Sequence, residues 1–244
     1  MTGPTIGKKR VPVQPGKVVI GYVHPGQVSA FFAHSLVVTV AADMGAARRI
    51  VGVEQEWSSA NISDSRNAVV RRFLNDYDAD WLWFIDADMA WDNNALEGLM
   101  AKCDAQSAPI VGGLCFGSSN GELFPTLYHL AEVDGEVTTV RVHEYTDNAL
   151  NQVAATGAAF LMIHRSVLVA MAEREFNSVF PWFQETHLGS RPVGEDITFC
   201  LRAGQLGFSV FVNAGVKVGH HKSNLLTAEL HAEQRAALEG TTNA

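Results

Sequence analysis

A run of five large apolar residues, Trp81-Leu82-Trp83-Phe84-Ile85, constrains this chain more than any other feature of its sequence, and it leads directly into Asp86. A segment that is apolar at every position is typical of a strand buried on both faces of a parallel sheet. Such a sheet has to be covered by helices on both sides, because each face would otherwise expose apolar side chains to water. The run therefore predicts an α/β fold in which residues 81–85 form a central strand.

Strands and helices are predicted to alternate through the first half of the chain. Short apolar runs predict strands at 18–23, about 49–54, 81–85 and 109–111. Apolar residues at helical spacing predict helices over 27–43 and about 65–76, and Asp92 is expected to cap a third helix that carries Leu96, Leu99 and Met100. This alternation is the pattern of a doubly wound sheet, in which ligand groups lie at the carboxyl ends of the strands.

The second half of the chain is less regular. Antiparallel strands are predicted over 123–145 around a turn at 133–136. The other predicted elements are a strand at 158–163, helices over 165–175 and from Gly194, short strands near 208–212 and 216–219, and a polar helix near 226–238. Residues 1–16, with three prolines, are expected to be a flexible lead-in. Residues 17–244 are expected to form one domain, with a nucleotide-binding half at about 17–115, an acceptor-side half at 116–225, and a C-terminal helix and tail at 226–244.

Composition limits the classes of protein to consider. The 244 residues are 47% apolar, which is enough for one substantial core without disulfides. The three cysteines, Cys103, Cys115 and Cys200, are odd in number and widely spaced, which argues against a disulfide framework or a cysteine metal site and favours a reducing compartment. No apolar stretch reaches the length of a membrane span, so a soluble, cytoplasmic protein is expected.

The formal net charge is −8, and the Lys and Arg residues are scattered along the chain. Non-specific binding to duplex nucleic acid requires a concentrated basic surface and is therefore not expected. An acidic protein that holds a diphosphate needs positive charge close to the phosphates. A bound divalent cation is the economical source of that charge.

The pattern Asp-x-Asp occurs three times, at Asp76-Tyr77-Asp78, Asp78-Ala79-Asp80 and Asp86-Ala87-Asp88. The first two lie in a polar segment between a helix and a strand, where solvated carboxylates are expected. The third follows the buried run, so its carboxylates emerge at the carboxyl edge of a central strand. Two carboxylates held this close repel each other unless a cation lies between them, and oxygen ligands favour Mg²⁺ or Mn²⁺. The alternative is a helix-capping turn that holds no metal.

Four segments resemble, in the same order, motifs of the GT-A-fold glycosyltransferases that use nucleotide sugars, family-2-like members in particular. The segments are Trp83-Phe84-Ile85-Asp86-Ala87-Asp88-Met89, similar to the metal-binding turn; Thr156-Gly157-Ala158-Ala159-Phe160, similar to a glycine-containing loop before the acceptor region; Gly194-Glu195-Asp196 followed by Phe199-Cys200 and Arg202, similar to the acidic motif; and Val218-Gly219-His220, similar to the C-terminal histidine. The resemblance implies a Rossmann-like, mostly parallel sheet with helices on both faces and a smaller antiparallel acceptor-side region.

The resemblance also implies a metal site. Asp88 and His220 would be direct ligands, and an imidazole ligand tilts the preference from Mg²⁺ toward Mn²⁺. Asp86 has three open roles, since it either binds the metal directly, binds through water, or contacts the ribose hydroxyls. His221 could exchange roles with His220, but neighbouring side chains of a strand point opposite ways, so only one of the two should reach the metal.

The same resemblance assigns the acceptor side of the reaction. Asp196 would be the catalytic base of an inverting transfer, with Glu195 orienting the acceptor or substituting for the base. Gly157 and Ala158 would belong to the loop that meets the acceptor. The alternative for Glu195 and Asp196 is that they only stabilise a helix N-terminus through its dipole.

Further contacts follow from position in a doubly wound sheet. Val23, His24 and Pro25 end the first strand and Glu54 ends the second, which are the places for a base and a ribose. The segment Ser65-Arg66-Asn67 at a helix start resembles the family's Arg-Asn segment, which implies that Arg66 pairs with a phosphate or stacks near the base; the alternative is an ordinary surface cation. Two aromatic residues are equally compatible with stacking on an acceptor sugar and with closing the core; they are Trp182 and Phe183.

The sequence therefore favours a metal-dependent hexosyltransferase that moves a sugar from a UDP- or GDP-sugar to a hydroxyl acceptor with inversion. A nucleotidyltransferase that makes sugar nucleotides is a neighbouring alternative, although no basic glycine-rich loop follows Val23. A non-catalytic module of the same fold that binds nucleotides or sugars is the alternative from another class. A dinucleotide-dependent oxidoreductase is disfavoured, because no Gly-x-Gly-x-x-Gly follows the first strand.

Overall fold

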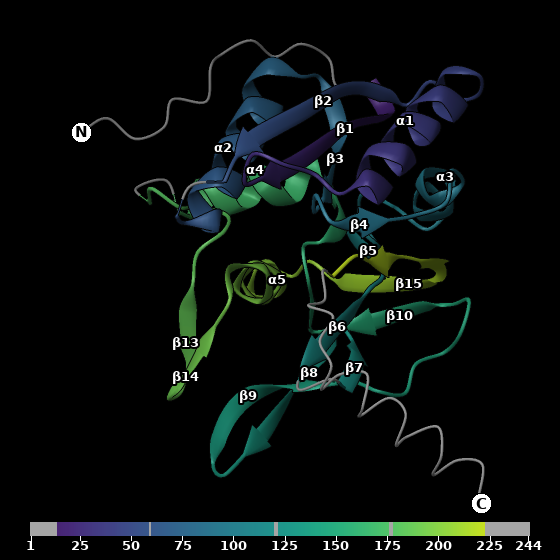
Figure 1. Ribbon diagram of the computed structural model, residues 1–244. Coiled ribbons are helices and arrows are strands. Elements are labelled where there is room, and N and C mark those ends of the chain that lie inside the picture. The colour runs from purple at the N-terminus through teal and green to yellow at the C-terminus, as the bar shows by residue number, and fades with distance from the viewer. Residues whose placement is uncertain (1–13, 59, 120–121, 176–177, 223–244) are drawn as a thin grey trace, which may run out of the picture.

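A seven-stranded sheet forms the centre of the protein in the computed structural model, which describes residues 14–58, 60–119, 122–175 and 178–222 (Figure 1). The strand order is β10-β15-β5-β12-β3-β1-β2. The strands are β1 (Gln14–His24), β2 (Ile50–Trp57), β3 (Ala79–Ile85), β5 (Ile110–Leu114), β10 (Leu150–Val153), β12 (Phe160–His164) and β15 (Val210–Lys217). The predicted run 81–85 lies inside β3 near the middle of the sheet, as expected for a strand without a polar face.

The sheet is mostly parallel. β1 pairs in parallel with both β2 and β3, and β5 pairs in parallel with β15. β12 lies between β3 and β5 and is antiparallel to both, and β10 is antiparallel to β15 at one edge. Five strands therefore share one direction, and their carboxyl ends meet at one edge of the sheet. This arrangement confirms the predicted α/β class.

Helices cover both faces of the sheet, as the continuous burial of β3 requires. α1 (Ala30–Met44) and α3 (Ala95–Met100) cover one face, and α2 (Ile62–Asp76), α4 (Arg165–Arg174) and α5 (Glu195–Gln205) cover the other. Side chains of β3 alternate between the two cores: Trp83 packs toward α1, and Phe84 packs toward α2. The two layers are visible to the right and left of the sheet in Figure 1.

Short antiparallel sheets accompany the central sheet, most of them between residues 116 and 193. They are β11 (Ala155–Thr156) with β8 (Leu127–Val133) and β9 (Glu136–Arg141), β6 (Phe116–Ser119) with β7 (Glu122–Pro125), β13 (Thr186–Leu188) with β14 (Arg191–Val193), and β4 (Met89–Ala90) with β16 (Gly219–His220). The predicted turn between β8 and β9 has positive φ at Asp134 and Gly135, as a tight hairpin turn requires. The last pair, β4 with β16, joins the middle of the chain to its C-terminal part.

Several predicted boundaries differ from the structure. β1 begins at Gln14, so part of the predicted lead-in is strand, and the rest of the lead-in, 1–13, lies outside the described residues, as does the predicted helix near 226–238. β15 is one strand where two short strands were predicted. Asp92 does not cap α3; the cap position is Asn94, and Asp92 contributes only its backbone oxygen to Ala95.

The prediction for Asp80 is wrong, and the prediction for the three cysteines is confirmed. Asp80 was predicted to be solvated, but it lies within β3 and its carboxylate accepts a hydrogen bond from the backbone N–H of Gly16 at 2.9 Å. The three cysteines are free, as predicted. Among the described residues, no helix combines the length and the apolar character needed to cross a bilayer.

Candidate functional site

The turn that follows β3 carries Asp86, Ala87 and Asp88. The backbone N–H of Asp86 donates to the carbonyl of Ala159 at 2.8 Å, and the N–H of Met89 donates to the carbonyl of Asp86 at 3.1 Å. These two bonds hold the turn on the central strands, and β4 follows at once. The two carboxylates point to different surroundings, which we call the outward side (Asp88, His220 and Lys222) and the inward side (Asp86, Arg66 and Glu195).

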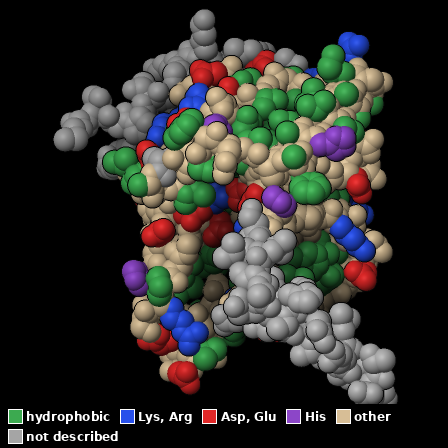
Figure 2. All heavy atoms as spheres, viewed as in Figure 1, with side chains coloured by type: hydrophobic (Ala, Val, Ile, Leu, Met, Phe, Trp, Pro, Cys, Tyr) green, Lys and Arg blue, Asp and Glu red, His purple; other side chains and the backbone are tan. Residues whose placement is uncertain are grey.

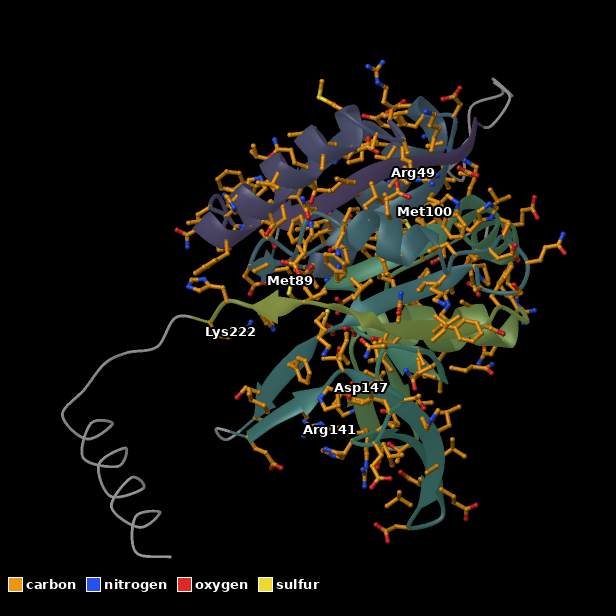
Figure 3. All side chains as sticks on the ribbon, turned by 90° about the vertical axis from the view of Figure 1, so that its right-hand side faces the viewer. Arg49, Met89, Met100, Arg141, Asp147 and Lys222 are labelled. Carbon is orange, nitrogen blue, oxygen red and sulfur yellow. The ribbon has the colours of Figure 1, made fainter. Side chains whose placement is uncertain are left out.

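On the outward side, β16 brings the C-terminal part of the chain to Asp88. His220 stands opposite Met89 in the antiparallel β4–β16 pair, and Figure 3 shows Met89 and Lys222 close to each other. His220 Nε2 lies 3.0 Å from Asp88 Oδ2, and its Nδ1 lies 3.0 Å from the carbonyl oxygen of Phe116. When His220 donates an Nδ1 proton to this carbonyl, its Nε2 lone pair can ligate a cation; to bond the Asp88 carboxylate directly, Nε2 must instead carry a proton, because two lone pairs repel each other.

The structure also separates the two histidines. His221 donates its backbone N–H to the carbonyl of Asp88 at 2.8 Å, while its ring lies 5.2 Å from the ring of Phe31. Its side chain therefore points away from the Asp88 carboxylate. The alternation along β16 selects His220 as the imidazole on the outward side.

The outward side has donor atoms that fit a divalent cation. A carboxylate and the free nitrogen of an imidazole are ligands that Mn²⁺ accepts. Among residues 14–58, 60–119, 122–175 and 178–222, no group of three or more His, Cys, Asp or Glu side chains is arranged to hold a metal. Asp88 and His220 are two side chains that could share one cation.

Lys222 adds a positive charge to the outward side. Its Nζ lies 3.1 Å from Asp88 Oδ2, the same oxygen that His220 contacts. The sequence analysis did not single out Lys222. Its position directly after the His220-His221 pair is the signal that could have found it, since three potential cations in succession follow a predicted strand.

On the inward side, Arg66 of α2 joins the two halves of the chain. Its guanidinium contacts Asp86 Oδ1 at 2.9 Å, and it also pairs with Glu195 at the start of α5. The Arg66 side chain is only 4% exposed, so it is not the surface cation that the sequence left as an alternative. Burial by itself lowers the pKa of Arg66, but the charges of Asp86, Glu195 and Asp196 outweigh burial and raise it.

The acidic residues at the start of α5 differ in their surroundings. Burial raises the pKa of Glu195, against the opposing attraction of Arg66. Asp196 accepts a hydrogen bond from the N–H of Ile197 at 2.7 Å. A side chain at Gly157 would begin 3.5 Å from Asp196 Oδ2, so the glycine keeps the space beside this carboxylate open. Ala158 next to it is buried in the core.

A cleft of about 660 Å³ opens beside the turn. Its floor includes Asp86, Ala87 and Asp88, and His221 and Lys222 stand at its border. Its apolar lining residues are Val23, Pro25, Val28, Ala30 and Ile62. Figure 2 shows acidic side chains gathered near the middle of this view of the molecule, with Lys, Arg and His side chains around them. The cleft therefore joins an apolar wall to a charged floor, as a nucleotide requires.

Two predicted nucleotide contacts lie away from this cleft. His24 Nε2 is bonded to Gln55 Oε1 at 2.6 Å, and His24 Nδ1 accepts from the N–H of Gly26 at 3.1 Å. Glu54 does not end β2, which continues to Trp57. Val23 and Pro25 do line the cleft.

The carboxylate of Glu54 is taken up by structural contacts on the α2 side of the sheet. It accepts from Arg72 at 2.7 Å and from the Tyr77 hydroxyl at 2.6 Å, and it raises the pKa of Tyr77 to about 12. Ser58, just beyond the true end of β2, lines the cleft instead. The sequence analysis missed Ser58 because it ended this strand too early.

The two aromatic residues proposed to meet an acceptor close the core instead. Trp182 and Phe183 are both buried. The indole N–H of Trp182 donates to the carbonyl of Leu168 at 2.7 Å, and the ring of Phe183 stacks on Phe199 with centroids 4.7 Å apart. Neither ring presents a face to a bound sugar, so the structure favours the second of the two roles that the sequence left open.

Comparison with known proteins shows which of them share this architecture. No model of a protein family and no curated protein matches the chain in sequence. A197 from STIV matches with a TM-score of 0.55 and 15% identity, over 85% of this chain and 86% of that one. GalNAc-T7, solved with UDP, GalNAc and Mn²⁺, matches with a TM-score of 0.54 and 13% identity, over 84% of this chain and 43% of that one. Both have GT-A-like folds.

The chain has a GT-A-like fold. The predicted resemblance is thereby confirmed at the level of the fold. In this GT-A-like chain the turn after β3, the loop at Gly157, the start of α5 and His220 come from four separate segments. The structure brings the first and last of them together at Asp88, and it joins the first and third through Arg66.

Proposed function

We propose that this protein is a metal-dependent glycosyltransferase that moves a sugar from a UDP- or GDP-sugar to a hydroxyl acceptor, with inversion at the anomeric carbon. The observation that carries the proposal is the meeting of Asp88 and His220, from segments 132 residues apart, beside a nucleotide-sized cleft. The fold shared with GalNAc-T7, whose structure contains UDP, GalNAc and Mn²⁺, supports the proposal.

Each part of the site has a task in this reaction. A divalent cation held by Asp88 and His220 would supply positive charge to the departing diphosphate. Lys222, on the same carboxylate, places a second positive charge beside the phosphates. The apolar wall near Val23 and Pro25 would contact the base.

Asp196 is the proposed base. It removes the proton of the acceptor hydroxyl while the acceptor oxygen bonds to the anomeric carbon and the bond from that carbon to the diphosphate oxygen breaks. The products are the glycosylated acceptor, the nucleoside diphosphate and a protonated Asp196 that returns its proton to water. Arg66 ties Glu195, the neighbour of Asp196, to the turn that bears Asp88. The base and the metal turn are thereby held in one arrangement.

The test is stabilisation by ligands together with turnover of a donor. UDP or GDP with Mn²⁺ should raise the melting temperature of the wild type by mass action. Asp88→Ala should abolish this shift and lower donor hydrolysis roughly 100- to 1,000-fold, while the melting temperature without ligand stays unchanged. Asp76→Ala is the matched control, since Asp76 belongs to an Asp-x-Asp on the exposed end of α2. Full activity of Asp88→Ala would overturn the assignment, and nucleotide binding without turnover of any donor would favour the non-catalytic module.

A further inference from the structure

Helix α1 turns polar side chains toward the protein. Ser35 donates to the carbonyl of Trp91 at 2.9 Å, and Thr39 accepts from the indole N–H of Trp91 at 2.8 Å. Asp43 accepts from the backbone N–H groups of Arg49 and Ile50 at 2.8 and 2.9 Å. All three side chains are buried. The inner face of α1 therefore combines these hydrogen bonds with the packing of Phe32, which is buried in the core.

The outer face of the same helix is apolar. Val37 is 66% exposed and Met44, two turns further along the same face, is 65% exposed. No Asp, Glu, Lys or Arg occurs between residues 27 and 42. A surface helix ordinarily has the opposite arrangement, with its apolar stripe inside and charged residues outside. The arrangement in α1 is that of a helix with a partner on its outer side.

The edge strand β2 extends this surface. Val53 stands opposite Ile20 of β1, and the Ile20 side chain lies in the core cluster that contains Phe32 of α1. Val53, and with it Val51 and Trp57 at alternate positions, therefore points to the face of the sheet that α1 covers. All three are exposed. We name Val37, Met44, Val51, Val53 and Trp57 the α1–β2 face. Figure 2 shows apolar side chains gathered over this part of the molecule.

We propose that the α1–β2 face is the contact surface of a symmetric homodimer. At ordinary side-chain areas, these exposed fractions amount to on the order of 500 Å² per chain, more than half of the roughly 800 Å² per subunit that a standard interface buries. A twofold contact brings the same surface of both copies together. The stretch 27–42 can meet its own copy without bringing like charges together, although the chain as a whole has a net charge of −8.

The charge of the chain argues against a lipid bilayer as the occupant. Helices that lie on membranes surround their apolar face with Lys and Arg, which attract anionic lipids. Residues 27–42 contain neither, and the net charge of −8 repels an anionic surface. A second copy needs no such attraction, because apolar area alone provides the association.

The mass of the protein in solution tests the proposal. Analytical ultracentrifugation of the full chain over a wide range of concentration should show a dimer of about 53 kDa, twice the 26.4 kDa of one chain. Val37→Glu and, in a separate variant, Val53→Glu should each raise the dimer dissociation constant at least about tenfold, because each puts two unpaired carboxylates into the contact. Both variants should stay folded, because Val37 and Val53 are exposed, and circular dichroism checks this.

The matched control is Leu123→Glu on the β6–β7 hairpin, where the leucine is 71% exposed outside the α1–β2 face. It should leave the dissociation constant unchanged. A wild type that stays monomeric at every concentration would overturn the proposal, as would glutamate variants that dimerise like the wild type. A monomer that floats with vesicles of anionic and zwitterionic lipid would assign the surface to a membrane instead.

Discussion

The outward and inward sides of the turn after β3 use the same residue type in opposite ways. Asp88 faces His220 and Lys222 at the border of the cleft, and its side chain is 39% exposed. Asp86 lies two residues earlier and pairs with Arg66, which is almost fully buried. Both carboxylates line the cleft and are partly exposed, Asp86 by 32% and Asp88 by 39%, so the difference lies in their partners: Asp86 pairs with a buried cation, and Asp88 contacts two more accessible side chains. The two carboxylates of one acidic pair can therefore have different electrostatic surroundings.

The inward and outward sides should respond differently to substitution, because their charged groups differ in burial. A buried ion pair stabilises little in net terms, but removal of one partner leaves an uncompensated charge in the interior. A partly exposed carboxylate is solvated whether or not its partners are present. Substitutions on the inward side should therefore change stability, and those on the outward side should change ligand binding.

The largest effect is expected from Arg66→Met. It leaves Asp86 and Glu195 without their cation and should lower the free energy of unfolding by about 3–5 kcal/mol in urea denaturation. Arg72→Met is the matched control, because Arg72 also pairs with two carboxylates but at a more exposed position. It should cost about 0–1 kcal/mol. Equal losses for the two variants would contradict the buried role of Arg66.

Asp86→Asn should have the next largest effect. A neutral amide keeps the shape but loses the charge-assisted bond to Arg66, so the unfolding free energy should fall by about 1.5–3 kcal/mol. The Mn²⁺ concentration that gives half of the thermal stabilisation with UDP or GDP should stay as in the wild type. If that concentration rises as much as it does for Asp88→Ala, Asp86 is a metal ligand and the two sides are not distinct.

His220→Ala should weaken the outward side alone. The Mn²⁺ concentration for half-stabilisation should rise by at least about 10- to 100-fold, the range found when only an outer partner of a metal ligand is lost. The melting temperature without metal should change little, because the ring is partly exposed. His221→Ala should leave the metal titration unchanged, since its ring faces Phe31. The reverse order of the two histidines would reject the assignment of the β16 side chains.

The smallest effect is a pH dependence that arises from Glu195. Because burial raises its pKa, folded Glu195 binds a proton more tightly than unfolded Glu195 does. This contribution to stability is present below the ordinary value of 4.5 and is lost as pH rises through the higher folded pKa. Wild-type stability relative to Glu195→Gln should therefore fall between about pH 4 and pH 7, as urea denaturation at several pH values would show. A constant difference across this range would contradict the raised pKa.

The elements that could be predicted from the sequence are those whose local residue pattern indicates which side chains are buried. β3 is apolar at every position, and α5 has the apolar spacing of a helix that packs on one side. The β8–β9 hairpin was found from its Asp134-Gly135 turn. These signals are local, so one sequence is sufficient to read them. The contact between Asp88 and His220 was also expected from the sequence, because their neighbours resemble known motifs, while the roles of the two residues stay predictions.

The remainder depended on contacts between distant segments. β2 is an edge strand, so its residues alternate between half-buried and exposed positions. This pattern gave no continuous apolar run up to Trp57, so the strand was predicted to end too early, at Glu54. The burial of Arg66 depends on Asp86 and Glu195, and that of Trp182 and Phe183 depends on α4 and α5. The Asp92 side chain could cap a helix that begins at residue 93, but α3 begins at Ala95, two residues later. No local pattern encodes these arrangements.

The position of β12 has a consequence for how the chain is assembled. β12 lies between β3 and β5, although it is made from residues 160–164, which are synthesised after β6 to β11. Until His164 has left the ribosome, the strands on either side of it have no partner along the facing edges. Residues 17–115 therefore cannot complete the sheet alone, and a truncation before residue 160 should yield a chain without a complete core. β12 thereby makes the core around β3 and β5 depend on a segment from later in the chain.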